Sequence, residues 1–423
     1  MKPFLPLKKK FAQDQQGAVA VMVAVALIAL FGIVALSIDV GYMYVARNEL
    51  QNIADGSALA ATNRLGQFYK TMTYDEQQAY VCDTSIDSDN DGVDDQTQII
   101  ALAKEVGLKN QAANQNISIL DADIIIGQWT PSTSTFTPTF NQPDAVRIIT
   151  RRDSTANSPI TTFFAKIIGT DTLSVTATAT AALTGQGTAA PGELELPVGI
   201  SAFFYENPEY CGDTIAFAPT NDPASCAGWN TFDISPASMN NLTRIINEEE
   251  GYENGEVITG ESEMEFTGAV GSAFDELLEL FRRKGYDIDC TSTVPGESNP
   301  ITDNDGNIVL GHCDPNNPDT PWCAGTCLLY DPDGVQLDYA DGTHRNRHEW
   351  LTTVVVYDSQ DCENPNQAIK IVGFSEVLMY DVRESPENTI KAIVMCNYVD
   401  SSGDSRGGGG DYGTKGNISG LVQ

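Results

Sequence analysis

Residues 87–95 carry the side chains of this sequence that are best suited to chemistry. The segment reads DSDNDGVDD, so its aspartates alternate with small or polar residues and one glycine allows a tight turn. Carboxylate oxygens that converge on such a loop are the ligands that Ca²⁺ prefers. We therefore expect a structural Ca²⁺ site here, with a solvated acidic loop as the alternative. The candidate ligands are Asp87, Asp89, Asp91 and Asp95.

The spacing of these aspartates is similar to that of the calcium loops in EF-hands and thrombospondin type 3 repeats. In that comparison they occupy the first, third, fifth and ninth positions of the loop. The twelfth position holds Gln98 instead of the bidentate glutamate of an EF-hand, and the flanks lack the pattern of EF-hand helices. A cation bound here would stiffen a loop and would not take part in a reaction.

Other polar clusters favour turns and surface positions over catalytic sites. The acidic runs at 303–306 and 331–334 are typical of turns. His344 and His348 do not form the HExxH pattern of metalloproteases, and the sequence contains no nucleophile elbow, P-loop or dinucleotide fingerprint. We expect no enzyme activity and no small-molecule substrate. A hydrolase whose site is assembled only in three dimensions stays open as an alternative.

The segment that must position everything else is residues 17–38, an apolar stretch without a charged residue. At about 1.5 Å per residue it is long enough to cross a hydrocarbon core of about 30 Å as a helix. Small residues at 35 and 37 leave a cleaved signal peptide as the alternative, although the stretch exceeds the usual h-region of such peptides.

The distribution of charge predicts the orientation of this span. Residues 1–38 carry four lysines and one aspartate, so the rest of the chain accounts for −37 within the total formal charge of −34. Positively charged flanks stay in the cytoplasm. We therefore expect a span in the bacterial cytoplasmic (inner) membrane, with the N-terminus inside and the ectodomain in the periplasm or at the cell exterior. The acidic ectodomain also argues against nucleic acid and anionic lipid as partners.

The helical pattern continues beyond the span, through residues 39–66. Apolar or small residues recur there at spacings of three and four, and Gly66 is predicted to end the helix. We expect this amphipathic part to offer a packing face to a sheet or to a partner helix, because its small residues permit close approach. The residues of that face are Leu50, Ile53, Ala54, Ser57, Ala58, Ala61 and Leu65.

Residues 17–65 resemble the N-terminal region of the TadE/TadG-like proteins of Flp (Tad) pilus assembly. The resemblance rests on GAVAV at the start of the span, IDVG at 38–41, YVAR at 44–47, LQN at 50–52 and ADGSALAA at 54–61. Its motif residues are Asp39, Gly41, Gln51, Asn52 and Asp55.

The resemblance implies a non-enzymatic, membrane-anchored component of Tad/Flp (type IVb) pilus assembly that contacts other Tad proteins or pilins. Pilin-like members carry a glutamate at the fifth residue after the cleaved glycine, whereas the fifth residue after Gly17 is Met22. In this respect the chain resembles the TadG branch, which implies an anchored assembly component more than a processed subunit. A von Willebrand factor A domain, whose metal site needs DxSxS, is expected to be absent, because the nearest string, at 233–238, has the wrong spacing. A processed minor pilin or tip adhesin is the alternative.

The predicted fold class is α+β, with a single N-terminal transmembrane helix that continues into an amphipathic helix and is followed by a mainly antiparallel β ectodomain. Strand-like runs occur between residues 117 and 183, at 350–357 and at 369–381, whereas 273–284 is helical and 163–169 forms an apolar patch. The predicted parts are a cytoplasmic segment (1–16), the span (17–38), its helical extension (39–66), a first domain (67–183), a Gly-rich linker (184–192), a second, cysteine-bearing domain (193–400) and a flexible tail (401–423).

All nine cysteines follow the span, and eight of them lie beyond residue 210. In an oxidising compartment this pattern indicates disulfide bonds in preference to a zinc site. Cys82 stands apart in the sequence and is predicted to be the unpaired one. The disulfide candidates are Cys211, Cys226, Cys290, Cys313, Cys323, Cys327, Cys362 and Cys396.

Overall fold

The computed structural model describes residues 15–72, 74–206, 214–219, 226–232, 234–264, 273–289, 346–359, 368–383, 387–400 and 405–422. These residues form two compact units. Unit 1 contains residues up to Ser57, Ala103–Ile124 and Ile148–Ala179, and unit 2 contains Ala58–Leu102, Ile125–Arg147 and the described residues from Thr180 onward. The long helix and several strands pass from one unit into the other.

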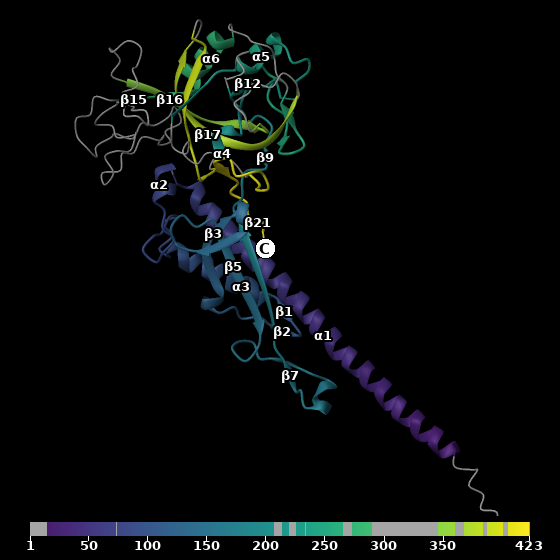
Figure 1. Cartoon of the computed structure of the whole chain (residues 1–423). Coiled ribbons are helices and arrows are strands. Elements are labelled where there is room, and N and C mark those ends of the chain that lie inside the picture. The colour runs from purple at the N-terminus through teal and green to yellow at the C-terminus, as the bar shows by residue number, and fades with distance from the viewer. Residues whose placement is uncertain are drawn as a thin grey trace, which may run out of the picture. The chain divides into compact units, whose positions relative to one another are not determined.

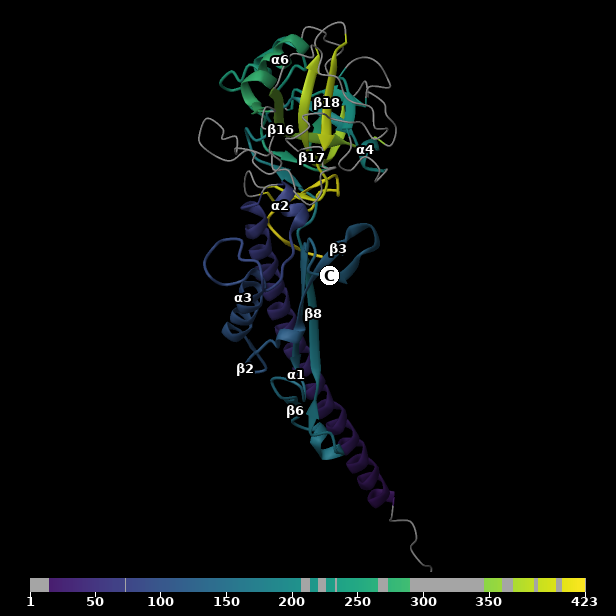
Figure 2. The same cartoon turned by 90° about the vertical axis from the view of Figure 1, so that its left-hand side faces the viewer.

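The chain begins with one uninterrupted helix, α1 (Gln15–Lys70). Its N-terminal turns run clear of other elements in both views, and their apolar side chains are exposed (Figures 1 and 2). Within the described residues, α1 is the one helix long and apolar enough to cross a membrane by length and composition. A mostly antiparallel β ectodomain follows, so the predicted fold class is confirmed.

The helix does not end at Gly66 but continues to Lys70. The residue is a glycine for another reason, because in unit 2 a Cβ atom added at Gly66 would collide with the backbone carbonyl of Asn417. This glycine therefore serves a close approach of two backbones inside a helix, and not the termination of that helix.

The sheet that packs on α1 has five strands in the order β21-β8-β5-β3-β4. Buried residues alternate with half-buried ones on β5 from Val146 onward and with exposed ones in the first half of β8, as expected for strands with one face against a core. The contact is tied by Thr150, whose Oγ1 donates to the Leu50 carbonyl (2.9 Å), and by Thr62, whose Oγ1 donates to the Ala181 carbonyl (3.2 Å). The strands are β3 (Ile124–Thr130), β4 (Thr135–Pro138), β5 (Ala145–Arg152), β8 (Val175–Ala182) and β21 (Gly420–Leu421).

The remaining elements of unit 1 are short and surround this helix–sheet layer. Two small hairpins, β1–β2 and β6–β7, extend from it. The bounds are β1 (Gln111–Ala112), β2 (Gln115–Asn116), η1 (Asp121–Asp123), β6 (Ile160–Thr161), η3 (Ala165–Ile168) and β7 (Thr172–Leu173). Helix α3 (Asp95–Lys109) enters unit 1 from unit 2.

Unit 2 is built around an eight-stranded sheet in the order β11-β18-β17-β16-β10-β12, with β14 beside β17 and β15 beside β16. Only β10 and β16 pair in parallel among its described pairings. Figure 2 shows β17 and β18 as neighbouring long arrows. The strands are β10 (Val198–Ser201), β11 (Thr214–Phe217), β12 (Ala227–Trp229), β14 (Glu263–Met264), β15 (Tyr286–Asp289), β16 (Asn346–Tyr357), β17 (Ile369–Arg383) and β18 (Thr389–Val394).

Helices α5 and α6 contribute apolar faces to the core of this sheet. Trp229 and Phe274 are both 1% exposed, and their rings pack edge to face with centroids 5.5 Å apart. Helix α6 coincides with the predicted helix at 273–284. The other helices of unit 2 are α2 (Tyr74–Ala79), η2 (Pro131–Thr133), α4 (Phe203–Glu206), α5 (Met239–Ile246) and α6 (Ala273–Lys284).

Two Gly-rich segments, predicted as a linker and a flexible tail, are packed against each other in unit 2. A Cβ atom added at Gly185 would collide with the Gly410 carbonyl, and one added at Gly409 would collide with the Gln186 carbonyl. Short strands frame this contact: β9 (Thr188–Ala189), β13 (Val257–Ile258), β19 (Tyr398–Val399) and β20 (Thr414–Lys415). Residues 405–422 are therefore part of the fold, because their glycines allow backbones to touch.

Candidate functional site

The loop of residues 87–95 lies immediately before α3 and is closed by its own hydrogen bonds. Asp95, the first residue of α3, is fully buried, and its carboxylate accepts hydrogen bonds from the Ser88 backbone N–H (2.9 Å) and the Tyr80 hydroxyl (2.7 Å). The Asp87 carboxylate accepts two backbone N–H groups of the turn, at 3.1 and 2.9 Å. The acidic side chains thus satisfy backbone donors of the loop.

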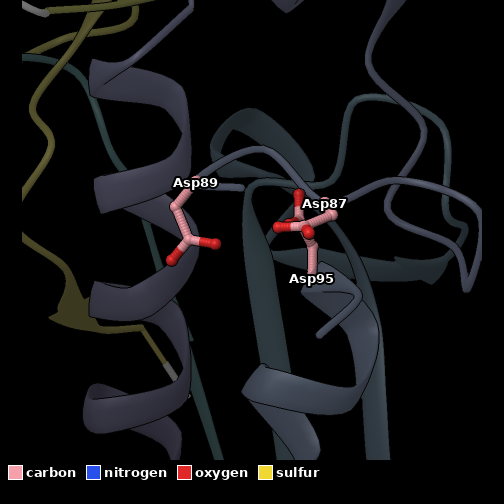
Figure 3. Close-up of side chains that lie close together, drawn as sticks. All are labelled: Asp87, Asp89 and Asp95. Atoms are coloured by element: carbon pink, nitrogen blue, oxygen red, sulfur yellow. The ribbon is translucent and has the colours of Figure 1, made fainter. Parts of the chain in front are cut away.

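Three of the four predicted calcium ligands come together. One carboxylate oxygen from each of Asp87, Asp89 and Asp95 lies within 4.8 Å of the others. Figure 3 shows Asp87 and Asp95 facing each other at the start of α3, with Asp89 beside a turn of α1. Asp91 is not in this group; its Oδ1 accepts a hydrogen bond from Gln98 Nε2 (3.1 Å).

Asp89 ties the loop to α1. Its carboxylate is paired with the guanidinium of Arg64, and its Oδ1 accepts a hydrogen bond from Gln98 Nε2 (3.1 Å). The hydrogen bond from Gln98 and the interaction with Arg64 lower the pKa of Asp89. Converging carboxylates suit a hard cation, but Ca²⁺ takes six to eight oxygen ligands and Arg64 already neutralises one of these three groups. The calcium site stays a prediction.

The face of α1 that was predicted to pack on a sheet or on a partner helix is covered by the chain itself. All seven of its residues are less than 5% exposed. Small side chains of β8 lie buried as well, which fits a helix packed closely on a sheet. This set comprises Leu50, Ile53, Ala54, Ser57, Ala58, Ala61 and Leu65.

Asp39, the first charged residue after the apolar span, holds a loop of unit 1 against α1. It is only 3% exposed, and its carboxylate accepts hydrogen bonds from three successive backbone N–H groups: Phe163 (2.7 Å), Phe164 (2.9 Å) and Ala165 (2.6 Å). Burial acts to raise the pKa of Asp39, but these hydrogen bonds and the nearby Lys166 outweigh it, so the pKa is lowered. The sequence marked both the motif aspartate and the apolar patch at 163–169 but gave no signal that they meet.

The other motif residues have more local surroundings. Gln51 Nε2 donates to Asp55 Oδ1 (2.7 Å), one helical turn away, and to the Thr178 carbonyl of β8 (3.0 Å). Asn52 is exposed, and the position of a Cβ atom at Gly41 has nothing within 4 Å. Gln51 therefore links α1 to the sheet, whereas Gly41 has no packing role within the described residues.

Three of the nine cysteines lie in the part of the chain that the structure describes. Cys82 has a free, buried thiol, as predicted, whereas Cys226 and Cys396 are disulfide-bonded. The other six candidates, namely Cys211, Cys290, Cys313, Cys323, Cys327 and Cys362, lie outside the described residues. The predicted acidic turns at 303–306 and 331–334 and His344 also lie outside them. His348 is half-buried, with Nε2 2.9 Å from the Phe281 carbonyl.

A polar cleft of about 210 Å³ lies in unit 2. Its wall includes an ion pair of Asp144 and Lys415, with Nζ and Oδ2 2.7 Å apart. Burial raises the pKa of Asp144, while the charge of Lys415 acts in the opposite direction. The Asp144 carboxylate also accepts the backbone N–H of Trp129 (2.6 Å), so both its oxygens are engaged in holding β3 and β20 together.

Comparison with known protein families identifies two domains in the chain. Residues 17–64 match the model of putative Flp pilus-assembly TadE/G-like proteins, and residues 84–181 match that of putative Tad-like Flp pilus-assembly proteins. The resemblance inferred from residues 17–65 is therefore confirmed. Neither a curated protein nor a solved structure matches the chain. The absence of a von Willebrand factor A domain stays a prediction.

Proposed function

We propose that this chain is a non-enzymatic, membrane-anchored component of Flp pilus assembly that acts through protein–protein contacts of its ectodomain. The two Tad-type domains support a role in this assembly, and membership of such a system implies contacts with other pilus components. In this proposal the N-terminus is cytoplasmic and the ectodomain lies outside the inner membrane.

The observation that carries the proposal is the continuity of α1. Val19, Ile28 and Ile33 are 59%, 72% and 68% exposed, whereas Leu50 and Ala54 of the same helix are fully buried in unit 1. One stretch of helix therefore has apolar surface that suits lipid, and the next belongs to the core of the ectodomain. Such a helix anchors unit 1 directly at the membrane, without a flexible linker.

The buried face of α1 also bears on where partners would bind. Because residues 50–65 pack on the chain's own strands, we expect other pilus proteins to contact the outer surface of the ectodomain, or the apolar turns of α1 within the membrane. A sheet is one of the two surfaces expected for this face, so the other, a partner helix, is not part of this proposal.

A processed minor pilin is the second candidate, favoured by the same exposed apolar turns. In a filament, these turns would pack among other helices instead of lipid. Met22 is 71% exposed and stands where pilin-like members carry a glutamate, so it offers no carboxylate to a neighbouring N-terminus.

The mature N-terminus of the native protein distinguishes the two candidates. We expect mass spectrometry to find Met1, in the membrane fraction only. A chain that begins at Ala18 in sheared filaments would overturn the anchored role and support the pilin. A chain that begins after residue 37 would show a cleaved signal peptide and would also overturn the anchor. A broad hydrolase screen on the purified chain should detect no activity.

A further inference from the structure

The tip of the β6–β7 hairpin is a compact, hydrogen-bonded loop. Thr162 donates its backbone N–H to the Asp171 carbonyl (3.0 Å) and its hydroxyl to the Thr170 carbonyl (2.6 Å). The short helix η3 lies between Thr162 and Thr170, and it is followed by Gly169, whose φ of +93° is a conformation suited to glycine. The tip therefore has a definite shape that can present side chains.

This tip is docked on α1 at the outer end of the apolar span. Asp39 accepts the three backbone N–H groups that open η3, and Tyr42 meets Phe163 edge to face with centroids 5.3 Å apart. In both views the hairpin end beyond β6 and β7 reaches along α1 towards its apolar half (Figures 1 and 2). The charge of Asp39, which directly follows the apolar span, is thereby satisfied by hydrogen-bond donors of the protein.

The side chains at the tip are apolar and exposed. Phe163, Phe164, Ile167 and Ile168 are 52%, 39%, 79% and 75% exposed. Apart from α1 and this tip, the exposed large apolar residues of the described chain are isolated in sequence, namely Ile86, Val93, Leu108, Phe140 and Leu421. Single exposed apolar residues are normal, but four within six positions mark a contact surface.

We propose that this tip, residues 163–168, inserts into the outer interfacial layer of the lipid bilayer beside α1 and forms a second membrane contact of the chain. The inference rests on the membrane anchoring proposed above. Lipid is the occupant because the tip is fixed to α1 by Asp39, which directly follows the exposed apolar residues between Val19 and Ile38. Exposed apolar side chains continue on α1 at Val40, Tyr44 and Val45, beside the tip's attachment point. The tip contains the aromatic rings of Phe163 and Phe164, and Lys166, whose long side chain can extend its amine to water. Both kinds of side chain are typical of this layer.

The consequence is a two-point attachment of unit 1. A single helix can rotate about its own axis and tilt in a bilayer, whereas a helix with an inserted loop at its side cannot rotate freely. The Asp39 contact would thus set which face of the ectodomain is turned towards neighbouring membrane proteins.

Spin labels on the full-length chain in lipid nanodiscs test this directly. The label is attached to Ile167→Cys in a Cys82→Ser background, and the same background without an added cysteine gives the signal to subtract. Ile28→Cys in the span and Leu108→Cys, an exposed apolar residue of unit 1 on α3, serve as lipid and water references. Collision rates with oxygen, which partitions into lipid, and with a water-soluble nickel chelate are then compared at each site.

We expect oxygen collisions to dominate at residues 167 and 28, and the nickel chelate to dominate at 108. A label at 167 that behaves like that at 108, while 28 stays in lipid, overturns the inserted tip but leaves the anchor intact. A label at 167 shielded from both reagents overturns it too, because the tip is then covered by protein. Water-like behaviour at 28 would overturn the anchor itself. Adding Asp39→Ala to the Ile167→Cys chain should shift the label towards water and raise its mobility.

Discussion

Replacing Gly66 by alanine tests whether close backbone packing, and not helix termination, explains this glycine. Inside a helix the change should by itself stabilise by about 1 kcal/mol. Here the new methyl group meets the backbone carbonyl of Asn417, which cannot turn away as a side chain would. Overpacking of this kind costs about 1–3 kcal/mol.

The carbonyl can move only if its neighbours lose hydrogen bonds. The Asn417 side chain donates to the Asp400 carbonyl (2.9 Å), and the Ser419 N–H donates to Asn63 Oδ1 (3.0 Å). At about 1 kcal/mol each, their loss brings the net cost to about 2–4 kcal/mol. Amide exchange measures this locally, and we expect residues 417–422 to exchange roughly 30- to 1,000-fold faster in Gly66→Ala.

Gly56→Ala is the matched control in the same helix. Its nearest neighbour would be Val106 Cγ1 at 3.7 Å, an ordinary contact, so we expect unchanged or slower exchange. The informative amides are those of Ile418 and Val422, which donate to carbonyls at 3.0 and 2.9 Å. Unchanged protection of both in Gly66→Ala, or an equal loss in Gly56→Ala, would refute the reasoning.

Three further predictions concern titration, metal binding and thiol reactivity. Burial raises the pKa of Glu376 to about 8, with repulsion from Asp400 adding to the rise. The folded state thus holds this proton more tightly than the unfolded state, and the free energy of unfolding should fall as pH rises from about 4.5 to 8, by at most about 1.4 kcal/mol per pH unit from this group. Urea unfolding at several pH values should show a shallower fall for Glu376→Gln, and an identical slope would contradict the assignment. Calorimetric titration should detect Ca²⁺ binding in about the millimolar range, lost in Asp87→Asn but kept in the surface control Glu261→Gln; the absence of heat would leave a solvated acidic loop. Burial raises the pKa of the Cys82 thiol to about 12, so iodoacetamide at about pH 8 should modify it only after unfolding, as mass spectrometry would show; rapid modification of the native chain would contradict its burial.

The sequence was most informative where local pattern decides the structure. The apolar span, its helical continuation and the helix at 273–284 follow from periodicity, and each appears as a helix. The strands at residues 124–130 and 145–152 likewise lie within residues 117–183, where strand-like runs were predicted. Three of the four predicted calcium ligands also converge, since they are close in sequence.

Glycine was where local reasoning failed. Gly66 was interpreted as a helix stop, and the runs around Gly185 and Gly409 as a linker and a tail, because glycine is flexible in isolation. In the structure these glycines lie where two backbones touch, and the partner backbone is distant in sequence. The same distance hid the partners of Asp39, which lie 124 to 126 residues away.

The packing of residues 417–419 on α1 has a consequence for biosynthesis. Ser419 reaches Asn63 and the Leu59 carbonyl, and the first of these contacts spans 356 residues. When the helix emerges from the ribosome, this covering segment has not yet been made. The surface of α1 around Leu59 and Gly66 is therefore uncovered through most of translation. Folding of unit 2 can finish only after residues 417–422, which include β21, have been synthesised. Ribosome-stalled chains that lack residues 405–422 should accordingly be captured by chaperones at this part of α1.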